Sequence, residues 1–398
     1  VISTGTQSNG SALVFSSETL RYHGGQGALV RLSSIFTAGV ANSEQVVGTG
    51  NGLNGLFFGY DGADFGVLRR TGGETEVRRL DVSTASTTNE DITITLDGIA
   101  ITDVSVTNSG DPTVTAREIA AHSYFNIGDG WGAQAVGDQV DFISFIPNSK
   151  PGTYSLSGAT TAVGTFSQTI AGVLPTDTWV AQADWNMDAM DGTGPSGMTL
   201  DPTKGNVYQI RYQWLGFGAI HFYVENDTNG EFQEVHRINY PNSNLLPSLD
   251  QPSGAVWTGI LNKGNTTDIS LKCACMAAFI EGKEDTLGIP QTCSRLFTIG
   301  ATTSETPVLT IRNKQVFQGK INQTRLEIES ITLTSNLNAA NANTTFRLYV
   351  SAFPEVGTDY QDVSTNSSVT ECDTASTGFN TTSAFLQDSF ILSATESK

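Results

Sequence analysis

The stretch NVYQIRYQW, residues 206–214, decides the fold class of this chain. Every second residue from Tyr208 to Trp214 is aromatic or aliphatic, and the residues between them are mostly polar. Successive side chains of a β-strand point to opposite faces, so this pattern predicts a strand with one buried and one solvated face. The segment LGFG, residues 215–218, leads into a second strand over residues 219–225, and residues 231–239 form a third.

The same alternation extends in both directions from this hairpin. The linkers DGAD, residues 61–64, and TGGE, residues 71–74, carry the glycines and acidic residues that suit tight turns. We therefore expect antiparallel strands joined hairpin after hairpin. The further predicted strands are residues 11–15, 28–36, 44–47, 56–60, 65–70, 75–80, 178–185, 255–261 and 269–280.

Residues 91–147 have a different character. The segment TVTAREIAAH, residues 113–122, predicts a helix capped by Thr113 or Thr115. Two strands precede it and two follow, so the order is β-β-α-β-β. Near the C-terminus, the best predicted strands are residues 308–312, 325–334 and 344–352.

These patterns predict a mainly β chain built on an antiparallel β-sandwich of jelly-roll or concanavalin-like kind. We assign residues 25–82 together with 184–300 to the sandwich, because neither part alone has enough strands for a two-sheet core. Residues 1–24 form an N-terminal arm, residues 83–183 an inserted αβ module, and residues 301–398 a C-terminal β domain. Four separate domains in a row are the alternative.

Composition excludes several functions. The chain has 398 residues and a net charge of −19, which argues against nucleic-acid binding because that requires a basic surface. No apolar run approaches the roughly 18 residues of a membrane helix, so we expect no membrane insertion. The chain opens on Val1 without a signal-peptide pattern, and we expect that processing has removed its start.

Few residues carry a recognisable chemical signature. The segment GNGLNG, residues 50–55, fits GxGxxG, but a strand follows it where a nucleotide site needs a helix. Asp188, Asp191 and Asp201 lie in or near a glycine-rich loop that could bind calcium, the one cofactor considered. Glutamates 225, 231 and 234 cluster in one hairpin, but no pair with the spacing of glycoside hydrolysis stands out. We therefore expect no catalytic residues.

Cysteine and histidine are scarce. Cys273 and Cys275 lie two positions apart in a predicted strand and should share a face, as two core thiols or as a soft metal pair. His221 and His236 lie on neighbouring predicted strands, as ordinary imidazoles or as metal ligands.

Three stretches carry a resemblance. GGQGALVR through GVANS (residues 24–43), FFGY with FGVLRR (57–70) and DPTKGNVYQIRYQWLG (201–216) resemble virion structural proteins of large aquatic DNA viruses and tailed phages, of the fibre, spike or minor-capsid kind. ITITLDG (92–98), AREIAA (116–121) and GWGAQAVG (130–137) resemble small β-β-α-β-β modules of phage tail and baseplate proteins. The resemblance covers roughly residues 20–300 and brings no catalytic residues.

The resemblance implies a non-enzymatic virion protein, surface-exposed as a fibre, spike, tail or minor capsid component. It implies other virion proteins as partners, a homo-oligomer such as a trimer, and attachment to a host surface glycan. The alternatives are a concanavalin-like carbohydrate-binding module and a glycan-cleaving enzyme. Candidate sugar-binding platforms are Trp185, Trp214 and Trp257, for which core packing is the other interpretation.

Overall fold

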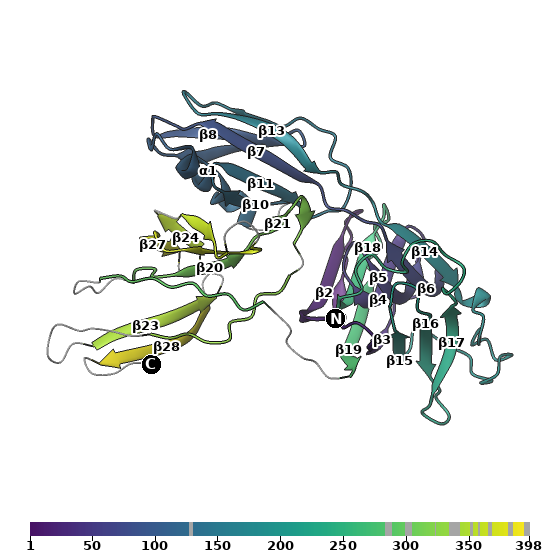
Figure 1. The fold of residues 1–398 in the computed structure, drawn as a ribbon. Helices are drawn as coiled ribbons and strands as arrows, with labels where there is room; N and C mark the ends of the chain where they lie inside the picture. Colours follow the sequence, from purple (N-terminus) through teal and green to yellow (C-terminus); the bar gives the residue numbers. More distant parts are fainter. Residues whose placement is uncertain are drawn as a thin grey trace. The chain divides into compact units, whose positions relative to one another are not determined.

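Figure 1 shows the fold of the chain in a computed structural model. The structure describes residues 1–126, 130–282, 289–298, 305–322, 324–333, 343–350, 353–356, 359–364, 368–380 and 385–393. This part of the chain is mainly β with antiparallel sheets, as the alternation predicts. It forms two compact units: unit 1 contains residues 1–74, 146–149 and 172–287, and unit 2 contains residues 75–145, 150–171 and 288–398.

Unit 1 contains two six-stranded antiparallel sheets, which we call sheet I and sheet II. In spatial order, sheet I consists of β14 (Thr176–Ala181), β6 (Asp64–Thr71), β5 (Gly55–Asp61), β4 (Ser43–Gly50), β18 (Gly254–Asn262) and β2 (Ser11–Leu20). Sheet II consists of β1 (Ile2–Ser3), β19 (Ser270–Glu281), β3 (Gly27–Ile35), β15 (Asn206–Tyr212), β16 (Ile220–Glu225) and β17 (Phe232–Ile238). The short 3₁₀ helix η2 (Gln182–Asp184) follows β14.

One hydrophobic core draws side chains from both sheets of unit 1. The ring of Phe58 on β5 lies 4.8 Å from that of Tyr208 on β15 and 5.3 Å from that of Phe222 on β16, centroid to centroid. All three side chains are fully buried, and burial of each stabilises the fold by roughly 1.5–3 kcal/mol. Ile210 and Tyr212 point into the same core, as the alternation of residues 206–214 predicts.

Unit 2 contains a second core beneath the only α-helix of the described residues, α1 (Pro112–Ala120). Ala116 and Ile119 of the helix pack with Phe142 and Ile94 of the neighbouring strands. The first sheet is β10 (Trp131–Val136), β11 (Gln139–Ser144), β7 (Val77–Thr84) and β13 (Val163–Ile170), and the second is β12 (Ser155–Ser157), β8 (Glu90–Leu96) and β9 (Ile99–Val106). The 3₁₀ helix η1 (Ser123–Asn126) follows α1.

The cap of α1 differs from the predicted one. Asp111 is the N-cap, and its carboxylate accepts the N–H of Thr113 at 2.9 Å. Thr115 is buried instead, and its hydroxyl accepts the N–H of Ser86 at 3.2 Å. A carboxylate followed directly by Pro112 explains the earlier start, because proline fits the first helical turn.

The rest of unit 2 consists of short antiparallel pairings. Residues 325–333, which lie in a predicted strand, take part in no strand pairing. One sheet is β20 (Thr310–Asn313), β26 (Thr370–Asp373) and β25 (Tyr360–Asp362), and three strand pairs are β21 (Val316–Phe317) with β22 (Lys320–Ile321), β23 (Asn343–Val350) with β28 (Phe385–Ser393), and β24 (Phe353–Val356) with β27 (Gly378–Asn380).

The compact units divide the chain differently from the predicted domains. Residues 1–24, predicted as an N-terminal arm, contribute β1, which pairs with β19, and β2, which pairs with β18. Strand β7, assigned to the sandwich, pairs with β11 and β13 of unit 2. Strand β14, assigned to the inserted module, pairs with β6 of unit 1. Backbone pairing between distant segments sets these boundaries, and local sequence patterns do not report it.

The predicted C-terminal domain also groups with the αβ module. The side-chain amide of Gln134 on β10 donates to the carbonyl of Asn313 at 3.2 Å and accepts the N–H of Gln315 at 2.7 Å. Arg312 donates to the carbonyl of Ala135 at 2.6 Å. These bonds add a polar connection between β10 and the start of the C-terminal region within unit 2.

Candidate functional site

One row of side chains crosses all six strands of sheet I on the face turned away from the core. Residues directly opposite one another in an antiparallel sheet carry their side chains on the same face. The strand neighbours of this row, such as Phe58, Val67 and Val256, lie in the core, so the row itself faces outward. In order across the sheet, the row is Trp179, Leu68, Phe57, Gly48, Trp257 and Phe15.

Glycines occupy neighbouring positions on the same face of the central strands, and we call them the glycine floor. A Cβ atom at Gly59 would lie 1.8 Å from the carbonyl oxygen of Gln45, and one at Gly66 would lie 2.2 Å from that of Val180. No side chain fits at such distances from backbone atoms, so the close approach of the strands requires glycine.

Sheet I curls over this outer face. Glu44 on β4 is paired with Asp61 on β5, and Asp61 is paired with Asp64 on β6. Arg70 lies six residues further along β6 than Asp64. Six residues span about 20 Å in a flat strand, further than two side chains reach. Yet the Arg70 guanidinium lies 3.1 Å from the Glu44 carboxylate, so the two ends of the sheet must bend towards each other.

A cluster of charges joins these two ends. Arg70 also binds Asp177 at 2.6 Å, and Lys263 lies 2.9 Å from Glu44 and 3.6 Å from Asp61. Burial lowers the pKa of Arg70, but its bonds to Asp177 and Glu44 outweigh burial and raise it, so the guanidinium stays charged. The side chains of Arg70 and Glu44 are only 13% and 8% exposed, which makes this a largely desolvated ion cluster.

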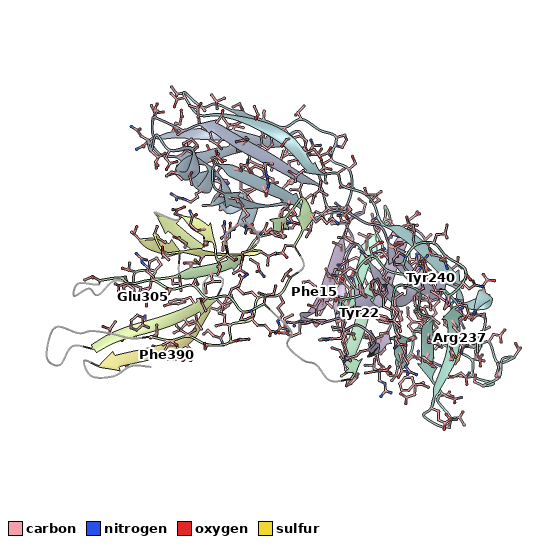
Figure 2. The ribbon with its side chains drawn as sticks, viewed as in Figure 1. Phe15, Tyr22, Arg237, Tyr240, Glu305 and Phe390 are labelled. Carbon is pink, nitrogen blue, oxygen red and sulfur yellow. The ribbon has the colours of Figure 1, made fainter. Side chains whose placement is uncertain are left out.

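We define the aromatic face as Trp179, Trp257 and Phe15, the accessible aromatic side chains of the row. Phe15, labelled in Figure 2, is 55% exposed. Its ring stacks on that of Trp257, with centroids 5.5 Å apart. Both tryptophans are half-buried and pack on a small second core of Val46, Phe57 and Leu68.

The aromatic face can hold sugars. The apolar face of a sugar ring packs on an aromatic ring, and its hydroxyls bond charged groups strongly. Trp179 and Trp257 both pack on the second core of Val46, Phe57 and Leu68, so their rings border one surface. The nearby ion cluster supplies both donors and acceptors.

The three tryptophans predicted as sugar-binding platforms lie in two environments, the aromatic face and the core side of unit 1. Trp257 belongs to the aromatic face. Trp185 is only 6% exposed and packs edge-on against Phe58 in the core of unit 1. Trp214 is half-buried and donates its indole N–H to the carbonyl of Leu249 at 3.1 Å. The sequence analysis did not identify Trp179. Its position in the stretch TDTWVA, residues 176–181, indicates that its side chain and that of Val180 point to opposite faces of a strand.

The predicted calcium ligands do not converge. The buried carboxylate of Asp188 accepts the N–H groups of Met190 at 2.9 Å and Ser196 at 2.8 Å, so it organises its own loop. Asp191 and Asp201 each bind the hydroxyl and N–H of the threonine two residues later. Among the described residues, no group of three His, Cys, Asp or Glu side chains could hold a metal ion.

The predicted carboxylate and histidine clusters are also separated. Both oxygens of Glu234 are engaged, by His221 at 2.8 Å and Arg237 at 2.6 Å. Burial raises the pKa of Glu234, but the bonds from Arg237 and His221 outweigh it and lower the pKa, which does not suit a general acid. His236 is paired with Phe222, the neighbour of His221, so the two histidines lie on opposite faces of sheet II.

A β-bulge separates the two cysteines expected to share a face. Cys273 is paired with Ser34 and Cys275 with Ser33, with a register shift between them. Adjacent serines of a strand point to opposite faces, so the cysteines do too, because the extra residue of the bulge reverses the alternation. The structure therefore does not bring them together as a metal pair.

No protein-family model matches this chain, and no curated protein matches it. None of the helices in the described residues combines the length and the apolar character needed to cross a membrane.

Proposed function

We propose that this chain is a non-enzymatic structural protein of a virion, a surface-exposed fibre, spike, tail or minor capsid component, and that the aromatic face attaches it to glycans on a host surface. The observation that carries the attachment role is the row of Trp179, Trp257 and Phe15 across a glycine floor beside an ion cluster. Contiguous apolar surface can mark a binding site, and this row brings three accessible aromatic rings to one face.

The sequence resemblance and the mainly β composition support the virion role. In this proposal, the two sheets of unit 1 form a jelly-roll or concanavalin-like sandwich, and the αβ module is inserted into it. The protein binds other virion proteins and itself, as a homo-oligomer such as a trimer, and needs no cofactor. Sandwich domains suit this role because they pack side by side in symmetric assemblies.

The same aromatic face favours one alternative, a concanavalin-like carbohydrate-binding module that works outside a virion. Immunogold labelling of purified virus particles with an antiserum against the chain separates the two. Gold on the particle surface supports the virion role. If particles from cells that make the protein carry no gold, the virion role is contradicted. The carbohydrate-binding module then remains as the alternative.

Oligomeric state is measured by light scattering after size-exclusion chromatography. A closed oligomer, such as a trimer, is expected. A monomer at micromolar concentration contradicts autonomous assembly, and therefore a fibre or spike.

A glycan array tests attachment. The wild-type chain should bind a defined set of glycans, and the double variant Trp179→Ala, Trp257→Ala should bind them at least about tenfold more weakly, because a lost aromatic contact is worth over 1 kcal/mol. The control is Phe279→Ala, which removes a 51% exposed aromatic residue from the outer face of sheet II. Equal loss in the control contradicts the assignment to the aromatic face.

A further inference from the structure

A pocket of about 300 Å³ opens between the edge strands of the two sheets of unit 1. Strand β14 ends sheet I and strand β17 ends sheet II, and inward positions of both line the pocket. We call it the edge pocket. Its lining residues include Val67, Arg69, Val180, His236, Tyr240 and Asn244. Arg237, which binds Glu234, also lines it, and Figure 2 labels Tyr240 and Arg237.

Arg69 is the unusual member of this pocket. Its guanidinium donates to the Tyr240 hydroxyl at 3.3 Å and to the Ser248 carbonyl at 3.1 Å, and lies over the Tyr240 ring. Both partners are neutral, and no carboxylate of the described residues lies within ion-pair distance of Arg69. The next residue, Arg70, binds two carboxylates. In a chain of net charge −19, a half-buried arginine without an acidic partner lacks the ion pair that normally offsets burial.

His236 adds a neutral donor. Its side chain is buried, and its Nδ1 accepts the N–H of Asn186 at 3.4 Å, so in the neutral ring the proton lies on Nε2. Burial lowers the pKa of His236 more than Glu234 raises it, which favours the neutral ring. Nε2 makes no hydrogen bond within the described part of the chain, and His236 lines the pocket.

The walls define the rest of the ligand. Val67, Val180 and Ile238 are apolar, whereas Tyr240 and Asn244 supply polar groups. The volume suits one small molecule, and an unpaired guanidinium prefers a planar carboxylate. We propose that the edge pocket binds a carboxylate-bearing monosaccharide, with its carboxylate on Arg69 and a hydroxyl on Nε2 of His236.

This site is independent of the aromatic face, because the two share no residue and lie on opposite faces of sheet I. It therefore adds a second sugar contact, specific for acidic sugars, to the proposed attachment role. A negative result at one of the two sites therefore does not contradict the proposal for the other.

The test compares glucuronate with glucose, which differ by a carboxylate in place of a hydroxymethyl group. Isothermal titration of the full chain should detect binding of glucuronate. The chain should bind glucose at least about tenfold more weakly, as expected for the loss of a hydrogen bond to a charged group. Equal binding of the two sugars, or competition by inorganic sulfate as strong as by glucuronate, overturns the proposal.

Two variants place the site. Arg69→Met should weaken glucuronate binding at least about tenfold, and the control Arg211→Met, on the outer face of sheet II, should not. Because Arg69 also bonds the Ser248 carbonyl, Thr178→Trp provides a second variant that fills the pocket from an exposed position and leaves Arg69 intact. Undiminished binding in either folded variant contradicts the site. Trp257→Ala should leave glucuronate binding unchanged, so it separates this site from the aromatic face.

Discussion

The two sheets of unit 1 differ in how charged groups and glycines are placed on their outer faces. On sheet II, charged and polar groups pair with one another: Arg31 donates to Gln209 at 2.8 Å, and Arg211 binds Glu281 at 2.8 Å. On sheet I, glycines lie on the central strands, the half-buried rings of Trp179 and Trp257 lie towards the two edges, and the charges gather where the curled ends meet. The two sheets share strand number and one core, so their internal packing does not explain the difference.

This difference indicates what each face is for. A solvated sheet face needs polar groups that satisfy one another, and sheet II has such pairs around the exposed ring of Phe279. Accessible aromatic rings over a glycine floor gain little from water and gain more from an apolar partner. We therefore propose the outer face of sheet I as the binding face.

The largest effect is expected where a side chain is added to the glycine floor. Gly59→Val should destabilise unit 1 by about 4 kcal/mol, because its Cβ would lie 1.8 Å from the Gln45 carbonyl oxygen. Ala277→Val, on the outer face of sheet II, should change stability by less than about 0.5 kcal/mol. Urea unfolding followed by tryptophan fluorescence measures both, since four of the five tryptophans lie in unit 1. Similar midpoints for the two variants would show that the floor is not tightly packed.

A matched pair of arginines gives the next effect. Arg70→Met should lower stability by about 3 kcal/mol, because it leaves the carboxylates of Glu44 and Asp177 without their shared cation. Arg211→Met removes a 52% exposed partner of Glu281 and should lower stability by less than about 1 kcal/mol. The same unfolding experiment applies. An Arg70→Met variant as stable as Arg211→Met would mean that the sheet does not curl as described.

The smallest effect concerns pH. The pKa of Glu234 is lower in the folded protein than in the unfolded chain, so its pairing stabilises the fold above its unfolded pKa, near 4.5. This contribution, less than about 1 kcal/mol, is lost as pH falls through the folded pKa. Glu234→Gln should therefore reduce the acid loss of stability below pH 4.5 without changing the glycan binding assigned to sheet I. If thermal unfolding showed the same loss of stability below pH 4.5 in wild type and variant, Glu234 would not be part of the ion pairs of sheet II.

Local alternation predicted most strands of unit 1, though not β1, and it did not predict which strands are neighbours. Residues 206–212 form the expected strand because Tyr208, Ile210 and Tyr212 bury one face. Register, however, decides which distant residues meet. Trp179 and Trp257 share a row only through four intervening pairings, which no local pattern encodes.

The candidate site was predictable in part for the same reason. Trp185 and Trp257 both lie in strand-like sequence, but one enters the core and the other the outer face. The loop with Asp188 has the composition of a calcium site, yet its carboxylate bonds the loop backbone. Composition gives the residue types of a site, and tertiary pairing decides their surroundings.

The most direct test of binding at the aromatic face is a nitrogen–proton NMR titration that follows the five indole N–H signals as an array-selected glycan is added. The account predicts that the signals of Trp179 and Trp257 shift with a common dissociation constant. Those of the buried Trp185, of Trp214 with its Leu249 bond, and of Trp131 in unit 2 should stay in place. Shifts confined to Trp131, Trp185 or Trp214, with Trp179 and Trp257 unmoved, would contradict it.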